Sequence, residues 1–202
     1  SVGIMAKNLP KEERKSQIME AAMKIITRKG FANSRLDDIV KETGLSKGAI
    51  YHHYEGKKEI FLALIDHWET QAFPDFYSRR GRERSAVGTL RDFSKEMVKV
   101  FKARSYVFQA EVEFWSLANQ DEEIRVRSQE LYEKIINLFE LVIVKGIREQ
   151  EFLPVDSRST AIYILSVFQG INWFCIFEDS VVDAEDYINN SIELIIKGIS
   201  LD

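Results

Sequence analysis

Apolar residues recur along most of this chain at the three- and four-residue spacing of amphipathic helices. The first clear case is the segment 11–29, in which the apolar positions are Ile18, Ala21, Ala22, Ile25 and Ile26. The strict alternation typical of a half-buried strand is not found beside such segments. The sequence therefore predicts an all-α fold of about nine helices.

The same periodicity predicts eight further helices after the first, approximately over residues 34–43, 46–54, 56–73, 87–103, 106–117, 121–149, 156–177 and 183–199. Gly30 and Gly44 follow two of the early helices, and glycine can take the left-handed conformation that ends a helix. We expect an N-terminal three-helix domain over residues 1–56. A larger helical bundle should follow over residues 57–202, and its first helix should link the two domains.

Residues 34–57 read SRLDDIVKETGLSKGAIYHHYEGK and predict two short helices joined by a tight turn. Ser34 is the candidate cap of the first helix and Ser46 of the second. Gly44 ends the first helix, and Ile50 gives the second an apolar position. Two helices joined by a turn of three or four residues that contains glycine form a helix-turn-helix motif, whose second helix enters the major groove of DNA.

The strings KGFANSRLDDIV and GLSKGAIYHHYEGKKEIF resemble the DNA-binding domain of the TetR family of transcriptional regulators, over roughly residues 12–64. The departures are modest. Val40 stands where Ala is usual in the family, Arg35 where Thr is common, and Tyr54 where Phe is common. Tyr54 continues the face of Ile50, so we expect it to lie in the core.

The second helix of the motif carries Lys47, Tyr51, His52 and His53, which are not needed for core contacts and can donate hydrogen bonds to phosphates or base edges. The resemblance implies that Lys47, Ala49 and His52 lie nearest to base edges. It implies phosphate contacts for Tyr51, His53 and Lys57. Gly48 would let the backbone approach DNA or the preceding helix closely. The predicted DNA-binding set is Ser34, Arg35, Ser46, Lys47, Gly48, Ala49, Tyr51, His52, His53 and Lys57.

The net charge of -4 conceals an asymmetry between the two ends of the chain. Residues 1–60 carry 12 basic and 8 acidic side chains, which leaves 16 basic and 24 acidic side chains for the rest of the chain's 28 and 32. A basic N-terminal third on an acidic body favours a polyanionic partner at one end only. A bias this small also arises by chance.

Residues 159–177 carry no charged side chain, and their number, 19, is close to what spans a bilayer. Polar residues are nevertheless spread through the segment, namely Ser159, Thr160, Ser166, Gln169 and Asn172. We therefore expect no membrane contact but a helix buried on both sides, by its own domain and by a second subunit. The homodimer would form through residues of about 158–177 and 184–199. The stretch GIREQEFLPVDSRSTAIYILSVFQGI also resembles the family's dimerisation region, less specifically.

The segment FQAEVEFW places a carboxylate, Glu111, among aromatic side chains. A carboxylate in an aromatic cavity binds cations or hydrogen-bond donors. The family resemblance implies an internal pocket for a small-molecule effector within residues 80–202. The candidate lining residues are Phe108, Glu111, Trp115, Asn172 and Trp173, and each is equally well explained as a core or dimer-interface residue.

Other classes of site lack their parts in this sequence. We find no glycine-rich phosphate loop or nucleophile elbow, and Glu111 and Glu113 face apart on a helix, so we expect no enzyme and no cofactor. His52 and His53 are adjacent and point about 100° apart, which disfavours a metal site. Cys175 is the single cysteine, and no signal-peptide pattern opens the sequence. Both observations favour the cytoplasm.

These features together predict a homodimeric, ligand-responsive transcriptional repressor. It would bind double-stranded operator DNA of near-palindromic sequence, and a small molecule in the helical body would release it. One alternative is a helical small-molecule carrier or sensor that no longer reads DNA. Another is an enzyme on a helical bundle. Neither explains the donor-rich second helix of the motif.

Overall fold

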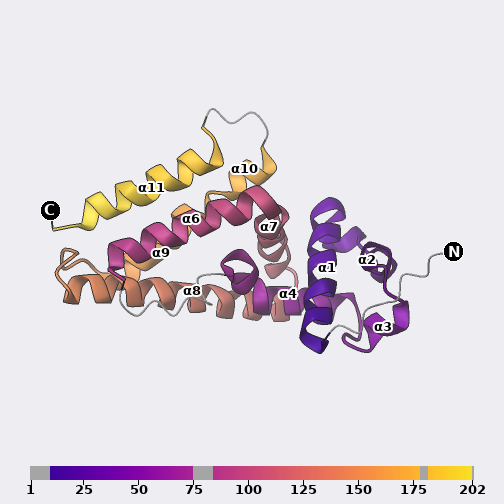
Figure 1. Cartoon of the computed structure of the whole chain (residues 1–202). Helices are drawn as coiled ribbons and strands as arrows, with labels where there is room; N and C mark the ends of the chain where they lie inside the picture. The colour runs from indigo at the N-terminus through magenta and orange to yellow at the C-terminus, as the bar shows by residue number, and fades with distance from the viewer. Residues whose placement is uncertain (1–9, 75–83, 178–181, 202) are drawn as a thin grey trace. The chain divides into compact units, whose positions relative to one another are not determined.

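The computed structural model describes residues 10–74, 84–177 and 182–201, and the regular structure in these ranges is helical. The all-α prediction is therefore confirmed. The chain divides into two compact units, Ser1–Leu64 and Ile65–Asp202, and the division falls inside helix α4 (Lys57–Ala72) (Figure 1). Because α4 contributes to both units, assigning the whole helix to a domain 57–202 stays a proposal.

The first unit, hereafter unit 1, contains α1 (Lys11–Asn33), α2 (Leu36–Thr43), α3 (Lys47–Tyr51) and the first half of α4. Its core consists of apolar side chains from each helix, including Ile18, Ala22, Met23, Ile26, Ile39, Ile50, Tyr54, Ile60 and Phe61. The predicted burial of Tyr54 is confirmed. Gly30 and Gly44 have φ of 73° and 69°, so the helical path breaks where the sequence predicted.

The start of α2 corrects one prediction. Arg35, not Ser34, holds the cap position, and the Asp38 carboxylate accepts the Arg35 backbone N–H at 2.9 Å. The carboxylate three residues after the cap, that of Asp38, forms one half of a capping box. Ser34 is 2% exposed, and its hydroxyl donates to the Phe31 carbonyl at 2.7 Å.

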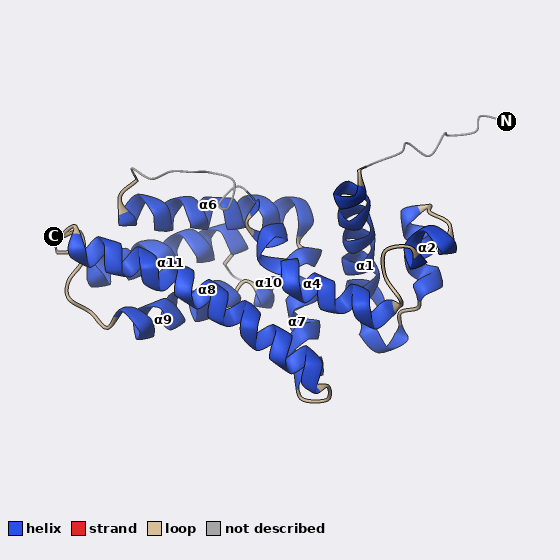
Figure 2. Cartoon of the chain, turned by 90° about the horizontal axis from the view of Figure 1, so that it is seen from below, coloured by secondary structure: helices blue, strands red, loops and turns tan. Residues whose placement is uncertain are grey.

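The second unit, hereafter unit 2, is a helical bundle built around a long central helix, α8. Beyond the second half of α4, its helices are α6 (Ala86–Arg104), α7 (Tyr106–Ala118), α8 (Glu122–Arg148), α9 (Ser157–Gln169), α10 (Asn172–Ile176) and α11 (Ala184–Ile199). Helix α8 packs against α6, α7 and α9, and α11 covers α6 and α9 (Figures 1 and 2).

The single helix expected over residues 156–177 is interrupted, and this prediction was wrong in that respect. The Tyr187 hydroxyl of α11 donates to the Val167 carbonyl at 2.7 Å, which would otherwise accept the Ile171 N–H. The Ile171 N–H donates to the Phe168 carbonyl instead, so the helix tightens and α9 ends. Glycine is required at position 170, because a Cβ there would lie 2.0 Å from the Tyr187 hydroxyl oxygen.

The segment Ser157–Ile176 is the one stretch among the described residues that is long and apolar enough to cross a membrane. Its buried side chains, Ala161, Ile164, Leu165 and Phe168, lie in the core of unit 2, where α9 packs against α8. Ile162 and Tyr163 on the other side are exposed in the single chain. In the single chain, the segment is therefore buried on one side and exposed on the other, whereas the sequence predicted burial on both sides.

The link between α8 and α9 fastens three helices of unit 2 together. The Glu151 carboxylate accepts the backbone N–H groups of Ala86 and Val87 at 2.7 and 3.0 Å, which satisfies the start of α6. Phe152 is buried against Gly146 of α8, and Leu153 donates its N–H to the Ile199 carbonyl at the end of α11.

We expect Gly146→Ala to destabilise the protein, because the added Cβ would lie 2.1 Å from the Phe152 ring. Forcing a methyl group into a close-packed core costs about 1–3 kcal/mol of unfolding free energy. That corresponds to a loss of roughly 2–10 °C in melting temperature, measured by circular dichroism. Gly198→Ala in α11 is the control, since its Cβ would meet no atom within 4 Å. Equal melting temperatures for the two variants would contradict the contact.

Candidate DNA-binding surface and internal cavity

Helix α3 presents its polar side chains to solvent and is held from behind by one buried residue. It begins at Ser46, whose hydroxyl accepts the Ala49 N–H at 3.2 Å, as the sequence predicted. Ile50 is the buried side chain of the helix, whereas Lys47 is exposed and Tyr51 is 50% exposed. The outer face of α3 is therefore free of core contacts.

Two further members of the predicted set, Arg35 and Gly48, are exposed. Arg35 holds the cap position at the start of α2. A Cβ on Gly48 would meet no atom within 4 Å, so the lack of a side chain there serves no contact with α2. The second of the two expected roles for Gly48, close approach to the preceding helix, is thus removed. Close approach to DNA remains.

Lys47 forms an ion pair with Asp37 of α2, with 2.9 Å between Nζ and the carboxylate oxygen. The hydrogen bond from Lys47 to Asp37 raises the pKa of the lysine, so it stays protonated. Both side chains are exposed, and an exposed ion pair contributes little to stability. Exchanging Asp37 for a phosphate or a base edge therefore costs Lys47 little.

His52 and His53 follow the last residue of α3, which ends at Tyr51 and not at Tyr54 as predicted. Their rings meet edge to face with centroids 5.1 Å apart. Burial, and then the neighbouring His52, lowers the pKa of His53, so His53 is neutral at pH 7. Its Nδ1 is buried and has no hydrogen-bond partner among the described residues. His52 is the exposed member of the pair.

Metal binding is not supported at these histidines. Among residues 10–74, 84–177 and 182–201, no three His, Cys, Asp or Glu side chains lie close enough together to hold an ion.

Lys57 and Ser34, both predicted to bind DNA, donate hydrogen bonds to backbone carbonyl groups inside unit 1. Lys57 Nζ donates to the carbonyl oxygens of Phe31 and Ser34 at 2.6 and 2.9 Å and lies 4.2 Å from the centre of the Phe31 ring. Burial lowers the pKa of Lys57. An ammonium has three donors, so at most one is left for a phosphate. The pattern of charges in the sequence could not reveal these carbonyl partners.

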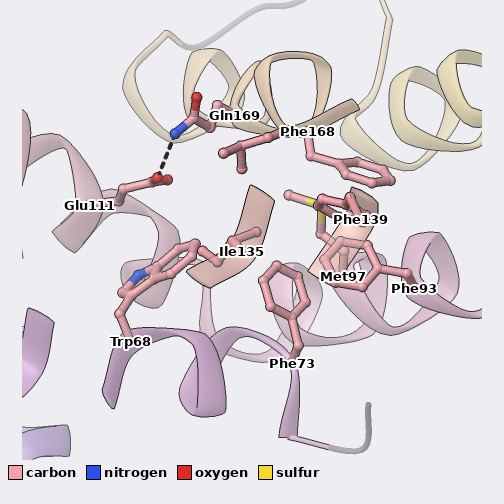
Figure 3. A pocket seen from close by; sticks show the side chains of 10 residues that line it. Trp68, Phe73, Phe93, Met97, Glu111, Ile135, Phe139, Phe168 and Gln169 are labelled. Atoms are coloured by element: carbon pink, nitrogen blue, oxygen red, sulfur yellow. Dashed lines mark hydrogen bonds between the residues drawn. The ribbon is translucent and has the colours of Figure 1, made fainter. Parts of the chain in front are cut away.

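The body of the protein contains the buried carboxylate of Glu111, on α7, which is 1% exposed. One carboxylate oxygen accepts a hydrogen bond from Gln169 at 3.0 Å (Figure 3). The other accepts one from Asn172 at 3.1 Å, and the Tyr132 hydroxyl also donates to the carboxylate. Burial raises the pKa of Glu111, and these hydrogen bonds oppose the rise only in part. The Asn172 carbonyl oxygen is buried without a partner among the described residues.

Glu111 lies at one end of a cavity whose other walls are mostly aromatic (Figure 3). The lining residues are Trp68, Phe73, Phe93, Met97, Glu111, Ile135, Phe139, Leu165, Phe168 and Gln169. The volume is about 10 Å³, which is room for one water molecule. In this conformation the side chains fill the space that a ligand would occupy.

The structure separates the five predicted lining residues. Glu111 lines the cavity, Asn172 bonds to it, and Phe108 is buried 6.1 Å from Trp68, ring centre to ring centre. Trp115 is partly exposed and donates to the Tyr132 hydroxyl at 2.6 Å. Trp173 is 67% exposed and stacks on Phe177 outside the cavity. Trp115 and Trp173 therefore do not line the cavity.

Two residues beside Glu111, Gln169 and Tyr132, were not predicted from the sequence. Gln169 and Asn172 are the polar residues at i and i+3 of an uncharged segment, so they share one face. That spacing was a usable signal for Gln169. Tyr132 carried none, because it lies in a helix with many charged residues and its burial depends on α7.

A helix-turn-helix with a donor-bearing, outward-facing second helix, joined to a helical body with an internal cavity, defines a DNA-binding regulator of the helix-turn-helix class. Residues 18–64 match the family model of the bacterial regulatory proteins of the tetR family. The N-terminal part of the chain therefore has the DNA-binding domain of TetR-family transcriptional regulators.

Relatives extend the likeness beyond the N-terminal unit. An uncharacterised helix-turn-helix transcriptional regulator of Bacillus subtilis, YfiR, is 25% identical over 163 residues, which are 80% of this chain and 79% of YfiR. A putative transcriptional regulator from Saccharomonospora viridis, solved with choline, has a TM-score of 0.79 at 19% identity and covers 95% of this chain and 100% of its own. FadR of Bacillus subtilis, solved with stearoyl-CoA, has a TM-score of 0.76 at 20% identity and covers 91% and 98%.

We expect Lys57→Met to weaken unit 1, because it leaves the carbonyl groups of Phe31 and Ser34 without their donor. A hydrogen bond from a charged donor contributes about 1.5–3 kcal/mol. A loss of about 2 kcal/mol speeds amide hydrogen exchange in α1 and α2 roughly 30-fold. Lys58→Met, at the exposed neighbouring lysine, is the control and should change exchange little. A Lys57→Met protein that exchanges like the wild type would show that Lys57 has no structural role.

We expect Gly48→Ala to fold normally and bind DNA poorly. Alanine favours a helix by up to about 1 kcal/mol over glycine, and the space around the new methyl group is empty in the free protein. At the DNA surface the methyl group blocks close approach of the backbone, so affinity should fall at least about tenfold. Fluorescence anisotropy with labelled duplex measures it, with Gly198→Ala as control. Unchanged affinity would mean that Gly48 does not face DNA.

Proposed function

We propose that the chain is a ligand-responsive homodimeric repressor that binds a near-palindromic operator and is released by a small molecule in unit 2. The observation that carries this proposal is the outer face of α3. Its donors face solvent while its hold on unit 1 rests on Ile50. Reading the major groove requires an exposed helix whose hydrogen-bond donors are not used in core contacts.

The DNA contacts that we propose follow from where each side chain lies. Lys47, Ala49 and His52 read base edges, and Arg35, Tyr51 and the remaining donor of Lys57 contact phosphates. The short α3 points its N-terminal end at the duplex, with Gly48 allowing close approach. Ser46 contributes by fixing the start of the helix, and His53 supports His52 from behind. Ser34 acts only inside unit 1.

Dimerisation would place two such helices in successive major grooves, about 34–36 Å apart. The surface that we propose for it lies on α9, α10 and α11. These helices expose the large apolar side chains Ile162, Tyr163, Trp173, Ile176 and Leu194 in the single chain. Exposed apolar side chains gathered on adjacent helices are typical of subunit interfaces. A second copy would complete the burial expected for residues 158–177, and the regulator would work in the cytoplasm.

The effector site that we propose is the cavity beside Glu111, and α4 is the element that would transmit its state. Trp68 of α4 lines the cavity and donates its indole N–H to the Val107 carbonyl at 2.8 Å. Asp66 and Glu69, on the same half of α4, pair with Arg127 and Lys134 of α8. Opening the cavity would displace Trp68, and the first half of the same helix, α4, belongs to unit 1.

This coupling is thermodynamic. A ligand shifts the protein between a DNA-binding and a released conformation only if it binds the two with different affinity. The FadR and Saccharomonospora viridis proteins were solved with stearoyl-CoA and choline, which supports an effector site in this fold but not either effector here.

Selection of bound duplexes from a random-sequence pool tests the DNA-binding part of the proposal. We expect an enriched inverted repeat whose half-sites are centred about one helical turn, or a multiple of it, apart. Affinity for that repeat should fall steeply with salt, because phosphate contacts release counterions. His52→Ala should lower the affinity about tenfold or more.

His67→Ala, at an exposed histidine in the other half of α4, is the control for His52→Ala and should bind as the wild type does. Failure to enrich any sequence would contradict the proposal. It would favour a helical carrier or sensor that no longer reads DNA.

A further inference from the structure

Among the described residues of unit 2, two carboxylates are buried, Glu69 and Glu111, and of these two Glu69 has a cationic partner. Glu69 forms an ion pair with Lys134. The partners of Glu111 are instead the neutral groups of Gln169, Asn172 and Tyr132. A buried carboxylate without a countercharge is strongly destabilising unless it is protonated or paired. Glu111 thus carries either a proton or a negative charge without a cationic partner among the described residues. A cationic ligand could neutralise the charge or replace the proton.

The walls around Glu111 suit a positive charge in a second way. The rings of Trp68, Phe73, Phe93 and Phe168 line the cavity that the carboxylate closes (Figure 3). The faces of aromatic rings carry negative potential and attract organic cations. An anionic ligand such as a free fatty acid would instead face the carboxylate in a desolvated site, where repulsion between like charges is strong. The lining thus favours cations over anions of similar size.

Room for a ligand exists next to this cavity. A hollow of about 250 Å³ lies between α6 and the start of α11, lined by Val98, Phe101, Lys102, Ile171, Asp183, Ala184 and Glu185. The Phe108 ring contacts the lining of both spaces, with its centre 6.2 Å from that of Phe101 in the hollow and 6.1 Å from that of Trp68 in the cavity.

The break between α9 and α10 also borders both spaces, because Gln169 lines the cavity and Ile171 lines the hollow. At this break the helix makes shorter-range hydrogen bonds, which are weaker than those of an α-helix. The rim of the hollow carries two carboxylates, Asp183 and Glu185, against the single ammonium of Lys102, which pairs with Glu185. The rim is therefore net negative, which also attracts cations.

We propose that unit 2 takes a lipophilic organic cation, such as a quaternary ammonium or phosphonium compound, whose charge pairs with Glu111 and whose apolar body lies between the aromatic walls. This inference rests on the proposed function, since it names the ligand class of that effector site. The cation enters through the hollow beside α11, displaces Phe108 and lies against the carboxylate. Gln169, Asn172 and Tyr132 hold Glu111 in place for it.

The test compares two probes of matched shape and opposite charge, tetraphenylphosphonium and tetraphenylborate, together with the smaller cation benzyltrimethylammonium. Binding to the full chain without DNA is followed by titration calorimetry and by tryptophan fluorescence. We expect the wild type to bind at least one of the two cations, and to bind it at least about tenfold more tightly than Glu111→Gln does. Glu113→Gln, two residues along α7, is the control and should keep the affinity. Tetraphenylborate should bind Glu111→Gln at least as tightly as it binds the wild type, because the variant lacks the negative charge.

The affinity for a permanent cation should also rise with pH in the wild type, because the carboxylate form of Glu111 is the one that binds. The other titratable groups facing Glu111 are Tyr132 of α8 and Cys175 of α10. Burial raises the pKa of both, that of Cys175 to about 12, so neither titrates between pH 5 and 9. Glu111→Gln should remove the pH dependence.

Stability without ligand gives an independent check that Glu111→Gln folds. A carboxyl whose pKa is raised in the folded state binds more protons folded than unfolded, so it lowers stability as pH rises above its ordinary value of 4.5. Glu111→Gln should therefore melt at a higher temperature than the wild type, by a difference that grows with pH.

Equal cation affinity in the wild type and Glu111→Gln, no binding of either cation, or preference for tetraphenylborate would overturn the inference. These outcomes leave the DNA-binding proposal intact. A cation that binds through Glu111 but does not change operator affinity would contradict only the ligand-responsive part of the proposed function.

Discussion

The surface that we propose to face DNA is anchored in unit 1 by the one buried side chain of α3, Ile50. Helix α3 has five residues, far fewer than a helix needs to be stable alone in water. Its position is set by the left-handed conformation of Gly44 before it, the Ser46 cap at its start and the insertion of Ile50 into the core of unit 1. Because one residue of α3 is buried, its other side chains remain available for the DNA contacts that we propose.

Local physics explains most of what could be predicted from the sequence. Helical periodicity identified the helices, because each buries a stripe of apolar side chains that the sequence spells out. Gly30 and Gly44 marked helix ends, because the conformation required there is local to the residue. The Ser46 cap and the burial of Tyr54 could be predicted for the same reason.

Contacts between distant segments account for what the sequence did not reveal. The break between α9 and α10 arises from the Tyr187 hydroxyl, which lies 20 residues away along the chain. The use of Lys57 inside unit 1 depends on carbonyl groups 23 and 26 residues away. Trp115 and Trp173 were predicted to line the pocket because they are large and apolar. Their exposure depends on the orientation of their helices in the folded bundle, which the sequence pattern does not give.

Unit 2 combines a well-filled aromatic core with one unfavourable group. Burial of Glu111 among neutral donors costs stability, which a core built for stability alone would avoid. A ligand of opposite charge would remove this cost, and the free energy of its binding would become more favourable by that amount. Gln169, which bonds to Glu111, lies directly before the break between α9 and α10. Trp68, in the wall of the same cavity, connects this region to α4.

The central proposal is that α3 reads DNA. Amide hydrogen exchange of the full chain, with and without its selected duplex, tests this most directly. The account predicts that exchange slows at the α3 amides and at the turn through His53, and at the start of α2, while the amides of α7 and α8 exchange as before. Protection confined to α6–α11, or none at residues 46–53, would contradict it.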